Sequence, residues 1–173
     1  MNESIRTLLE RRSVRAYKKQ PLSEEHLEII LKAGSYAPTA MNRQSPIMVA
    51  VTNPEEVALL SKLNAAVMGA ANDPFYGAPA VVVVLADRSI PAGVYDGSLV
   101  MGNLMNAAHA VGVASCWIHR AKEVFDSEEG KALLKKWGIE GDYVGIGNCI
   151  LGYAEGELPA AKPRKENYIY YVK

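Results

Sequence analysis

The chain has 173 residues, of which 49% are hydrophobic and 22% are charged, as expected for a folded globular domain and not for a disordered segment. Its 19 basic and 19 acidic residues balance, which argues against a general nucleic-acid-binding protein. No stretch approaches the ~18 consecutive apolar residues of a membrane-spanning helix, and the N-terminus shows no apolar signal core. We therefore expect a single cytoplasmic domain, residues 1–173, with neither a nucleic acid nor a membrane as partner.

Hydrophobic spacing and capping residues predict two helices near the N-terminus. A short first helix runs into a basic segment at residues 11–15. The second helix begins after Ser23, whose hydroxyl can cap it, and Gly34 fits just beyond its end. Residues 35–46 show no periodicity and are predicted to form an ordered loop.

From residue 47 onward, predicted strands and helices follow one another. Strands are expected at 47–52, 80–86, 113–118 and 143–153, and helices at 53–69, 96–111 and 127–138. Segment 80–86 is apolar throughout, which is typical of a central strand covered on both faces. Helix 96–111 has little polar surface and several small residues, which indicates close packing, either in the core or against a copy of itself.

The C-terminal tail, residues 155–173, is predicted to be an extended arm. It contains two prolines and no helical stripe, yet residues 168–172 have the aromatic and β-branched composition of a strand. No partner strand adjoins them in sequence, so they need a free sheet edge. Another subunit is the natural supplier of that edge.

The sequence offers few side chains for catalysis. His26, His109 and His119 are scattered, and no spacing typical of a hydrolase or a metal site occurs. No pair of carboxylates suggests acid–base chemistry, and we expect no bound metal. Cys116 and Cys149 lie in apolar runs, so we expect buried, reduced thiols.

Positive charge gathers at both ends of the chain. Arg11, Arg12 and Arg15 lie within five residues, and Lys162 and Arg164 form a second cluster. Each guanidinium stays charged and suits a phosphate or a carboxylate. Two interpretations remain open: a solvated basic helix end, or a cradle that clamps a small phosphorylated ligand from two sides. Such a ligand would be a cofactor with its own reactivity, because the protein supplies little.

Five segments occur in order over nearly the whole chain: RRSVRAY at 11–17, APTAMNRQ at 37–44, GAP at 77–79, NLMNAAHAVGVASCW at 103–117 and KPR at 162–164. Together they resemble the nitroreductase family of FMN-dependent oxidoreductases in its short bacterial form. The resemblance implies an α+β fold with a mostly antiparallel central sheet flanked by helices. It also implies an intertwined homodimer with an exchanged C-terminal strand and two FMN sites between the subunits.

The same resemblance implies three groups of cofactor-binding residues. The FMN phosphate and ribityl chain would be held by Arg11, Arg12, Ser13, Arg15, Lys162 and Arg164. The isoalloxazine ring would be touched, from the other subunit, by Pro38, Thr39, Ala40 and Asn42. The pyrimidine edge and the flavin N5 would be approached by backbone groups of Trp117, Ile118 and His119, with Asn72 as a further candidate.

The sequence departs from the family pattern in three places. Ser45-Pro46-Ile47 stands where Pro-Trp is common, and His119-Arg120 stands where small or acidic residues are frequent. The cationic pair could favour the anionic reduced flavin, attract the extra phosphate of NADPH, or point to solvent. The connection between residues 69 and 79 is short, so we expect an open, permissive substrate side.

The implied function is a two-step shuttle in which the flavin carries the chemistry and no side chain is catalytic. NADH or NADPH gives hydride to the flavin N5 and leaves, and a nitroaromatic, a quinone or a similar small acceptor then takes the electrons. A non-catalytic flavin-binding carrier or sensor is the alternative, and a phosphate- or nucleic-acid-binding module is a third. Dehydrogenase and reductive dehalogenase activities, which the family also includes, stay compatible with the sequence.

Overall fold

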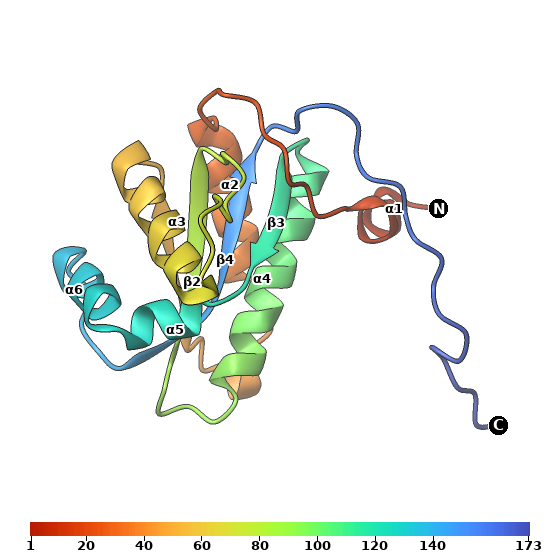
Figure 1. The fold of residues 1–173 in the computed structure, drawn as a ribbon. Helices are drawn as coiled ribbons and strands as arrows, with labels where there is room; N and C mark the ends of the chain where they lie inside the picture. The colour runs from red at the N-terminus through yellow and green to blue at the C-terminus, as the bar shows by residue number, and fades with distance from the viewer.

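The computed structural model describes residues 1–173, which fold around one four-stranded sheet (Figure 1). The helices are α1 (Glu3–Glu10), α2 (Glu24–Ser35), the short 3-10 helix η1 (Ala40–Asn42), α3 (Pro54–Met68), α4 (Gly93–Ala110), α5 (Ala121–Asp126) and α6 (Glu128–Lys136). The strands are β1 (Pro46–Val51), β2 (Ala80–Asp87), β3 (Ala114–Ile118) and β4 (Tyr143–Gly152). No helix is both long enough and apolar enough to cross a membrane.

The sheet has the strand order β1-β2-β4-β3, and every neighbouring pair is antiparallel. Strand β2 lies second in this order, and its residues from Ala80 to Ala86 are buried. This confirms the prediction from its unbroken apolar run, because a strand with helices on both faces needs no polar side. The expected α+β fold with an antiparallel central sheet is confirmed.

Helices cover both faces of the sheet and divide the core into two clusters (Figure 1). On one face, Val81 and Val83 of β2 pack in a cluster with residues of α3, α5 and α6. On the other face, Val82 and Val84 pack with residues of α2 and α4. Because successive side chains of β2 point to opposite faces of the sheet, this strand contributes residues to both layers of the core.

Helix α4 starts three residues before its predicted start and ends one residue before its predicted end. Its buried face lies against the sheet so closely that a Cβ on Gly97 would lie 2.6 Å from Ile146 Cγ1. Its other face exposes Val94, Tyr95 and Leu99. One side of this apolar helix thus packs in the core, and the opposite side is exposed to solvent on the single chain.

One prediction about a helix end is wrong, and one helix was not predicted. Gly34 is not a cap beyond α2 but a buried residue in its last turn, where a Cβ would lie 2.7 Å from Leu104 Cδ2. Its role is the close approach of α2 and α4. Helix α5 was not predicted at all, and Ser127 both ends α5 and caps α6 by accepting a hydrogen bond from Gly130 N.

The tail leaves the body of the single chain as an extended segment (Figure 1). Residues 155–173 are exposed and contain neither a helix nor a strand. Residues 168–172 form no strand within the single chain, because no edge of this chain supplies their hydrogen-bond partners. Their exchange with a second subunit stays a prediction.

Candidate functional site

The basic segment runs beside the edge of the sheet. Ser13 forms a parallel bridge with Ser115 of β3, and Val14 N donates to Ser115 O at 3.0 Å. Val14 and Tyr17 are buried, whereas Arg15 between them is exposed. Two buried apolar anchors thus fix the backbone and leave a guanidinium free at the surface.

Tyr17 strengthens this anchoring. Its hydroxyl donates to Val14 O at 2.9 Å and closes the segment into a compact turn. Burial of the ring raises the pKa of Tyr17 well above its usual range, so the side chain stays neutral and remains a donor.

The three arginines of the segment have no carboxylate partner. Arg12 Nη1 donates to the carbonyl oxygens of Leu9 and Arg11, at 2.8 and 2.7 Å, so this side chain holds the end of α1. Arg11 Nη1 is buried without an acceptor, and Arg15 makes no salt bridge. Unneutralised guanidinium groups in such a cluster are suited to bind an anion.

The loop that contains Pro38, Thr39, Ala40 and Asn42 is tied to the beginning of α4. Asp96 Oδ1 accepts a hydrogen bond from Ala40 N at 2.9 Å. Gln44 N donates to Thr39 Oγ1 at 3.0 Å, and Gln44 Nε2 donates to Asn42 Oδ1 at 3.1 Å. These bonds stabilise a loop in which three side-chain-bearing residues adopt a left-handed backbone, namely Met41, Asn42 and Gln44.

This loop and the basic segment lie at opposite ends of α4. The loop is bonded to Asp96 in the first turn, whereas the segment pairs with Ser115, which follows the helix C-terminus. Asp96 and Ala110 are fourteen positions apart in α4, which corresponds to about 20 Å of helix. One protomer therefore does not bring the two predicted halves of the site together.

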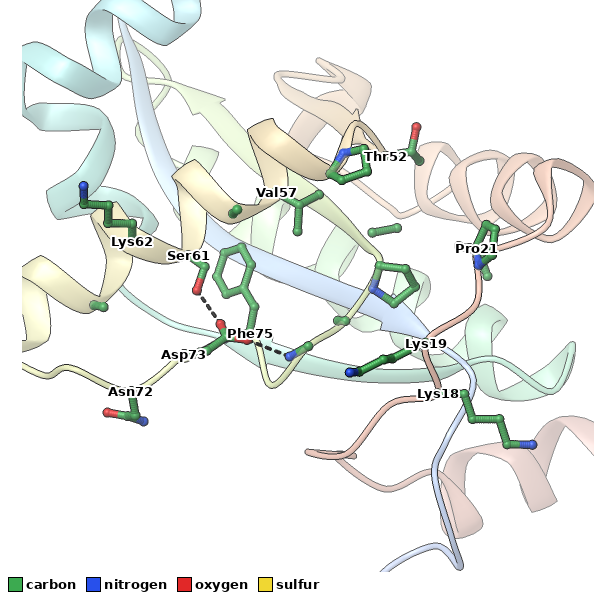
Figure 2. Close-up of a pocket in the computed structure, with 18 of the residues that line it drawn as sticks. Lys18, Lys19, Pro21, Thr52, Val57, Ser61, Lys62, Asn72, Asp73 and Phe75 are labelled. Atoms are coloured by element: carbon green, nitrogen blue, oxygen red, sulfur yellow. Dashed lines mark hydrogen bonds between the residues drawn. The ribbon is translucent and has the colours of Figure 1, made fainter.

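Asn72 is exposed on the loop after α3 (Figure 2). The neighbouring Asp73 holds that loop, since its Oδ1 accepts from Ser61 Oγ and from Phe75 N and its Oδ2 accepts from Gly77 N. The sequence analysis did not predict this role of Asp73. An aspartate that bonds the backbone two residues ahead is the signal that could have revealed it.

The predicted flavin-edge residues lie at the end of β3. Trp117 and Ile118 are the last two residues of the strand, and His119 follows with an exposed side chain. Arg120 adopts a left-handed backbone with φ 74°. The buried side chains of Asn64 and Asn148 donate to the carbonyl oxygens of His119 and Ile118. No local pattern in the sequence indicates a role for these two asparagines.

The second basic cluster lies on the exposed arm. Arg164 Nη2 donates to Lys162 O at 2.8 Å, and neither side chain forms a hydrogen bond with residues 11–15. The arm nevertheless begins beside the basic segment, because Glu155 N donates to Ala16 O at 3.0 Å. Lys162 lies seven positions after Glu155, and an extended chain of that length can span up to about 23 Å. Both cations can therefore reach the segment.

A groove of about 1030 Å³ adjoins Asn72 (Figure 2). Its walls are one face of α3, the loop from Ala70 to Ala80 and the segment from Lys18 to Leu22. Val57 and Phe75 contribute apolar surface, and lysines lie along it. A cavity of this size and character can accept an organic ligand.

The α+β domain thus carries arginines without carboxylate partners beside one sheet edge, and a groove lined by apolar residues and lysines, and both features suit an anionic organic molecule. The model of the nitroreductase family matches residues 8–74. An archaeal protein from Archaeoglobus fulgidus, provisionally named NADH dehydrogenase/NAD(P)H nitroreductase, is 32% identical over 163 residues, which is 91% of this chain and 88% of that protein. The chain belongs to the nitroreductase family.

Solved structures support the same assignment. A nitroreductase with bound FMN from Bacteroides fragilis superposes with a TM-score of 0.91 at 29% identity, with 100% of both chains covered. A nitroreductase with bound FMN from Desulfitobacterium hafniense gives a TM-score of 0.89 at 26% identity, again with 100% of both chains covered. The likeness extends over the whole fold and includes the arm.

Proposed function

We propose that this protein is an FMN-dependent oxidoreductase that uses NADH or NADPH to reduce a small acceptor such as a nitroaromatic or a quinone. The observation that carries the proposal is the unpaired arginine cluster at residues 11–15, in a chain whose structural relatives hold FMN. We propose further that the protein acts as a homodimer in the cytoplasm.

The donor set fits the phosphate end of FMN. Arg11 carries a buried Nη1 with no acceptor, and a phosphate oxygen would supply one. Arg15 and the hydroxyl of Ser13 lie on the same short segment, and Lys162 and Arg164 are within reach on the arm. A doubly charged phosphate would neutralise a cluster that has no acidic partner in the chain.

The ring end of FMN fits a site shared between two copies. Pro38, Thr39, Ala40 and Asn42 of a second protomer would cover the isoalloxazine, because the loop and the basic segment of one chain are separated by the length of α4. The bare apolar face of α4, with Tyr95 and Leu99, gives that second copy a surface to pack on.

FMN, when bound, supplies the redox chemistry. The chain holds the phosphate by charge, and it presents backbone N–H groups after Ile118 to the pyrimidine edge. Arg120 adds a positive charge and His119 a polar ring at that edge, and the groove beside Asn72 leaves room for the second reactant. Positive charge and fixed donors near the ring favour the negative charge that reduction places there.

An absorbance spectrum of the purified protein is the direct test. We expect a yellow protein that bleaches when NADH or NADPH is added without oxygen and recovers its colour when a quinone or a nitroaromatic follows. A protein that is yellow but does not bleach would be a flavin carrier or sensor. A colourless protein that takes up no added FMN would contradict the proposal altogether.

Two arginine variants test the phosphate clamp. Arg15→Ala and Arg164→Ala should each weaken FMN binding about tenfold or more, because a charge-assisted hydrogen bond contributes about 1.5–3 kcal/mol and ~1.4 kcal/mol is one decade in affinity. The dissociation constants are measured by fluorescence titration. Arg6→Ala is the matched control, since it removes the same charge from the exposed surface of α1. Unchanged affinity in both test variants would exclude the clamp.

A further inference from the structure

Two buried asparagines hold the backbone turn that follows β3. Asn64 of α3 is 0% exposed, and its Nδ2 donates to His119 O at 2.7 Å. Asn148 of β4 is 2% exposed, and its Nδ2 donates to Ile118 O over a longer 3.4 Å. Consecutive carbonyl groups are thus fixed from inside the protein by side chains of two different elements.

The chemistry of these contacts sets the direction of the amides. A peptide carbonyl can only accept, so the nitrogen of each asparagine must face it. Asn64 Oδ1 is left buried with no donor. A leucine of similar volume would fill the same space without burying an unpaired oxygen. The amide is therefore retained for the bond that it donates.

Fixing these carbonyls also fixes the N–H groups on the other side of each peptide. All peptide bonds are trans, so the N–H of a peptide points away from its carbonyl. The peptides that begin at Ile118 and His119 therefore direct the N–H groups of His119 and Arg120 away from the buried asparagines. Neither N–H donates a hydrogen bond within the chain.

The turn needs this support because its conformation is unfavourable. Arg120 has a positive φ of 74°, a region that residues with a side chain seldom adopt. Without an internal constraint, the peptides of His119 and Arg120 would be free to rotate. The asparagine amides supply that constraint.

We propose that Asn64 and Asn148 are positioning residues, which aim the N–H groups of His119 and Arg120 at acceptor oxygens on the pyrimidine edge of the flavin. The inference rests on the proposed function, since it requires FMN at this turn. It assigns the orientation of the flavin-edge donors to side chains that never touch the cofactor. Asn64 contributes more to this positioning than Asn148 does, because its hydrogen bond is much the shorter of the two.

The test compares Asn64→Leu and Asn64→Asp with Asn103→Asp. Asn103 Nδ2 donates to Ala33 O at 3.0 Å, so the control loses an equivalent amide hydrogen bond between α4 and α2, away from the turn.

In both Asn64 variants, the affinity for reduced FMN divided by the affinity for oxidised FMN should fall about tenfold. For a two-electron couple this lowers the midpoint potential of the bound flavin by about 30 mV. The turnover number should fall about tenfold while the KM for NADH changes less than twofold, and Asn103→Asp should leave the potential unchanged.

A measurement on the wild-type protein covers the case in which the Asn64 variants do not fold. Loading with FMN should slow the hydrogen exchange of the His119 and Arg120 amides at least tenfold. Unchanged exchange, or unchanged potentials in folded Asn64 variants, would overturn the assignment while leaving the protein a flavoenzyme. Failure of the wild-type protein to bind any FMN would instead overturn the proposed function itself.

Discussion

A single carboxylate, Asp96, fixes the loop that we expect to cover the flavin of the partner. It is 3% exposed, and its Oδ1 accepts from Ala40 N at 2.9 Å. Beyond Ala40, the loop contains residues with a left-handed backbone. An unconstrained chain would relax from this conformation to a more favourable one. The tether therefore stabilises a conformation that the loop sequence alone does not favour.

Removing this acceptor should loosen the loop. Asp96→Ala leaves the Ala40 N–H without its partner, and a hydrogen bond to a charged group contributes about 1.5–3 kcal/mol. We expect the free energy of unfolding, measured by urea denaturation, to fall by about 2 kcal/mol and FMN affinity to fall with it. Asp96→Asn keeps an oxygen at Oδ1 and should lose less than half as much. An equal loss in both variants would show that the negative charge, and not the tether, is what matters.

At the scale of residues, the sequence predicted the site where its motif is continuous. The arginines of segment 11–15 were identified because they are neighbours in the chain. Asp96, Asn64 and Asn148 were not, because each acts on a backbone group 56, 55 or 30 residues away. Only the folded chain brings such pairs together, and no local pattern records them.

At the scale of elements, local signals predicted most helices and strands. Ser23 caps α2 as expected, and Asn53 caps α3 at the predicted start of that helix, since a cap depends only on the next few residues. Helix α5 was not predicted because its six residues are too few to show a periodic pattern of hydrophobic residues. Its place depends on contacts with glycines that come later in the chain.

Gly130 is one of these glycines, and it sets the junction of α5 and α6. A Cβ at this position would lie 2.0 Å from Val124 O and 2.7 Å from Phe125 Cα, both backbone atoms that cannot move aside cheaply. Gly130→Ala should therefore push the two helices apart and lower the free energy of unfolding by about 2–3 kcal/mol. Denaturant unfolding measures the change.

Gly69→Ala is the control for backbone strain alone. Gly69 has a φ of 63°, and nothing lies within 4 Å of a Cβ there. The left-handed conformation should cost an alanine about 1 kcal/mol. A Gly130→Ala protein as stable as the wild type would mean that α5 and α6 are not packed as the structure shows.

At the scale of the whole molecule, the single chain leaves too much apolar surface bare. Leu8 and Leu9 on α1 and Tyr95 and Leu99 on α4 are all exposed. The arm adds residues 168–172, whose exposed fractions are 67–100%. The composition of 168–172 indicated a strand, but strand formation depends on an edge that this chain alone does not provide. A second copy would supply the edge and cover the bare helices together.

Removal of residues 167–173 tests this arrangement and separates the two roles of the arm. The truncated chain keeps Lys162 and Arg164 for the phosphate but loses the aromatic and β-branched residues. Burial of one large apolar side chain contributes about 1.5–3 kcal/mol, so the loss of even two should raise the dimer dissociation constant more than a hundredfold. Analytical ultracentrifugation over a range of concentrations measures it. If each FMN site is built from both copies, as we propose, FMN affinity should then depend on protein concentration, whereas Arg164→Ala should weaken FMN binding and leave the dimer intact. A truncated chain that sediments and binds FMN like the full chain would show that the arm does not hold the partner.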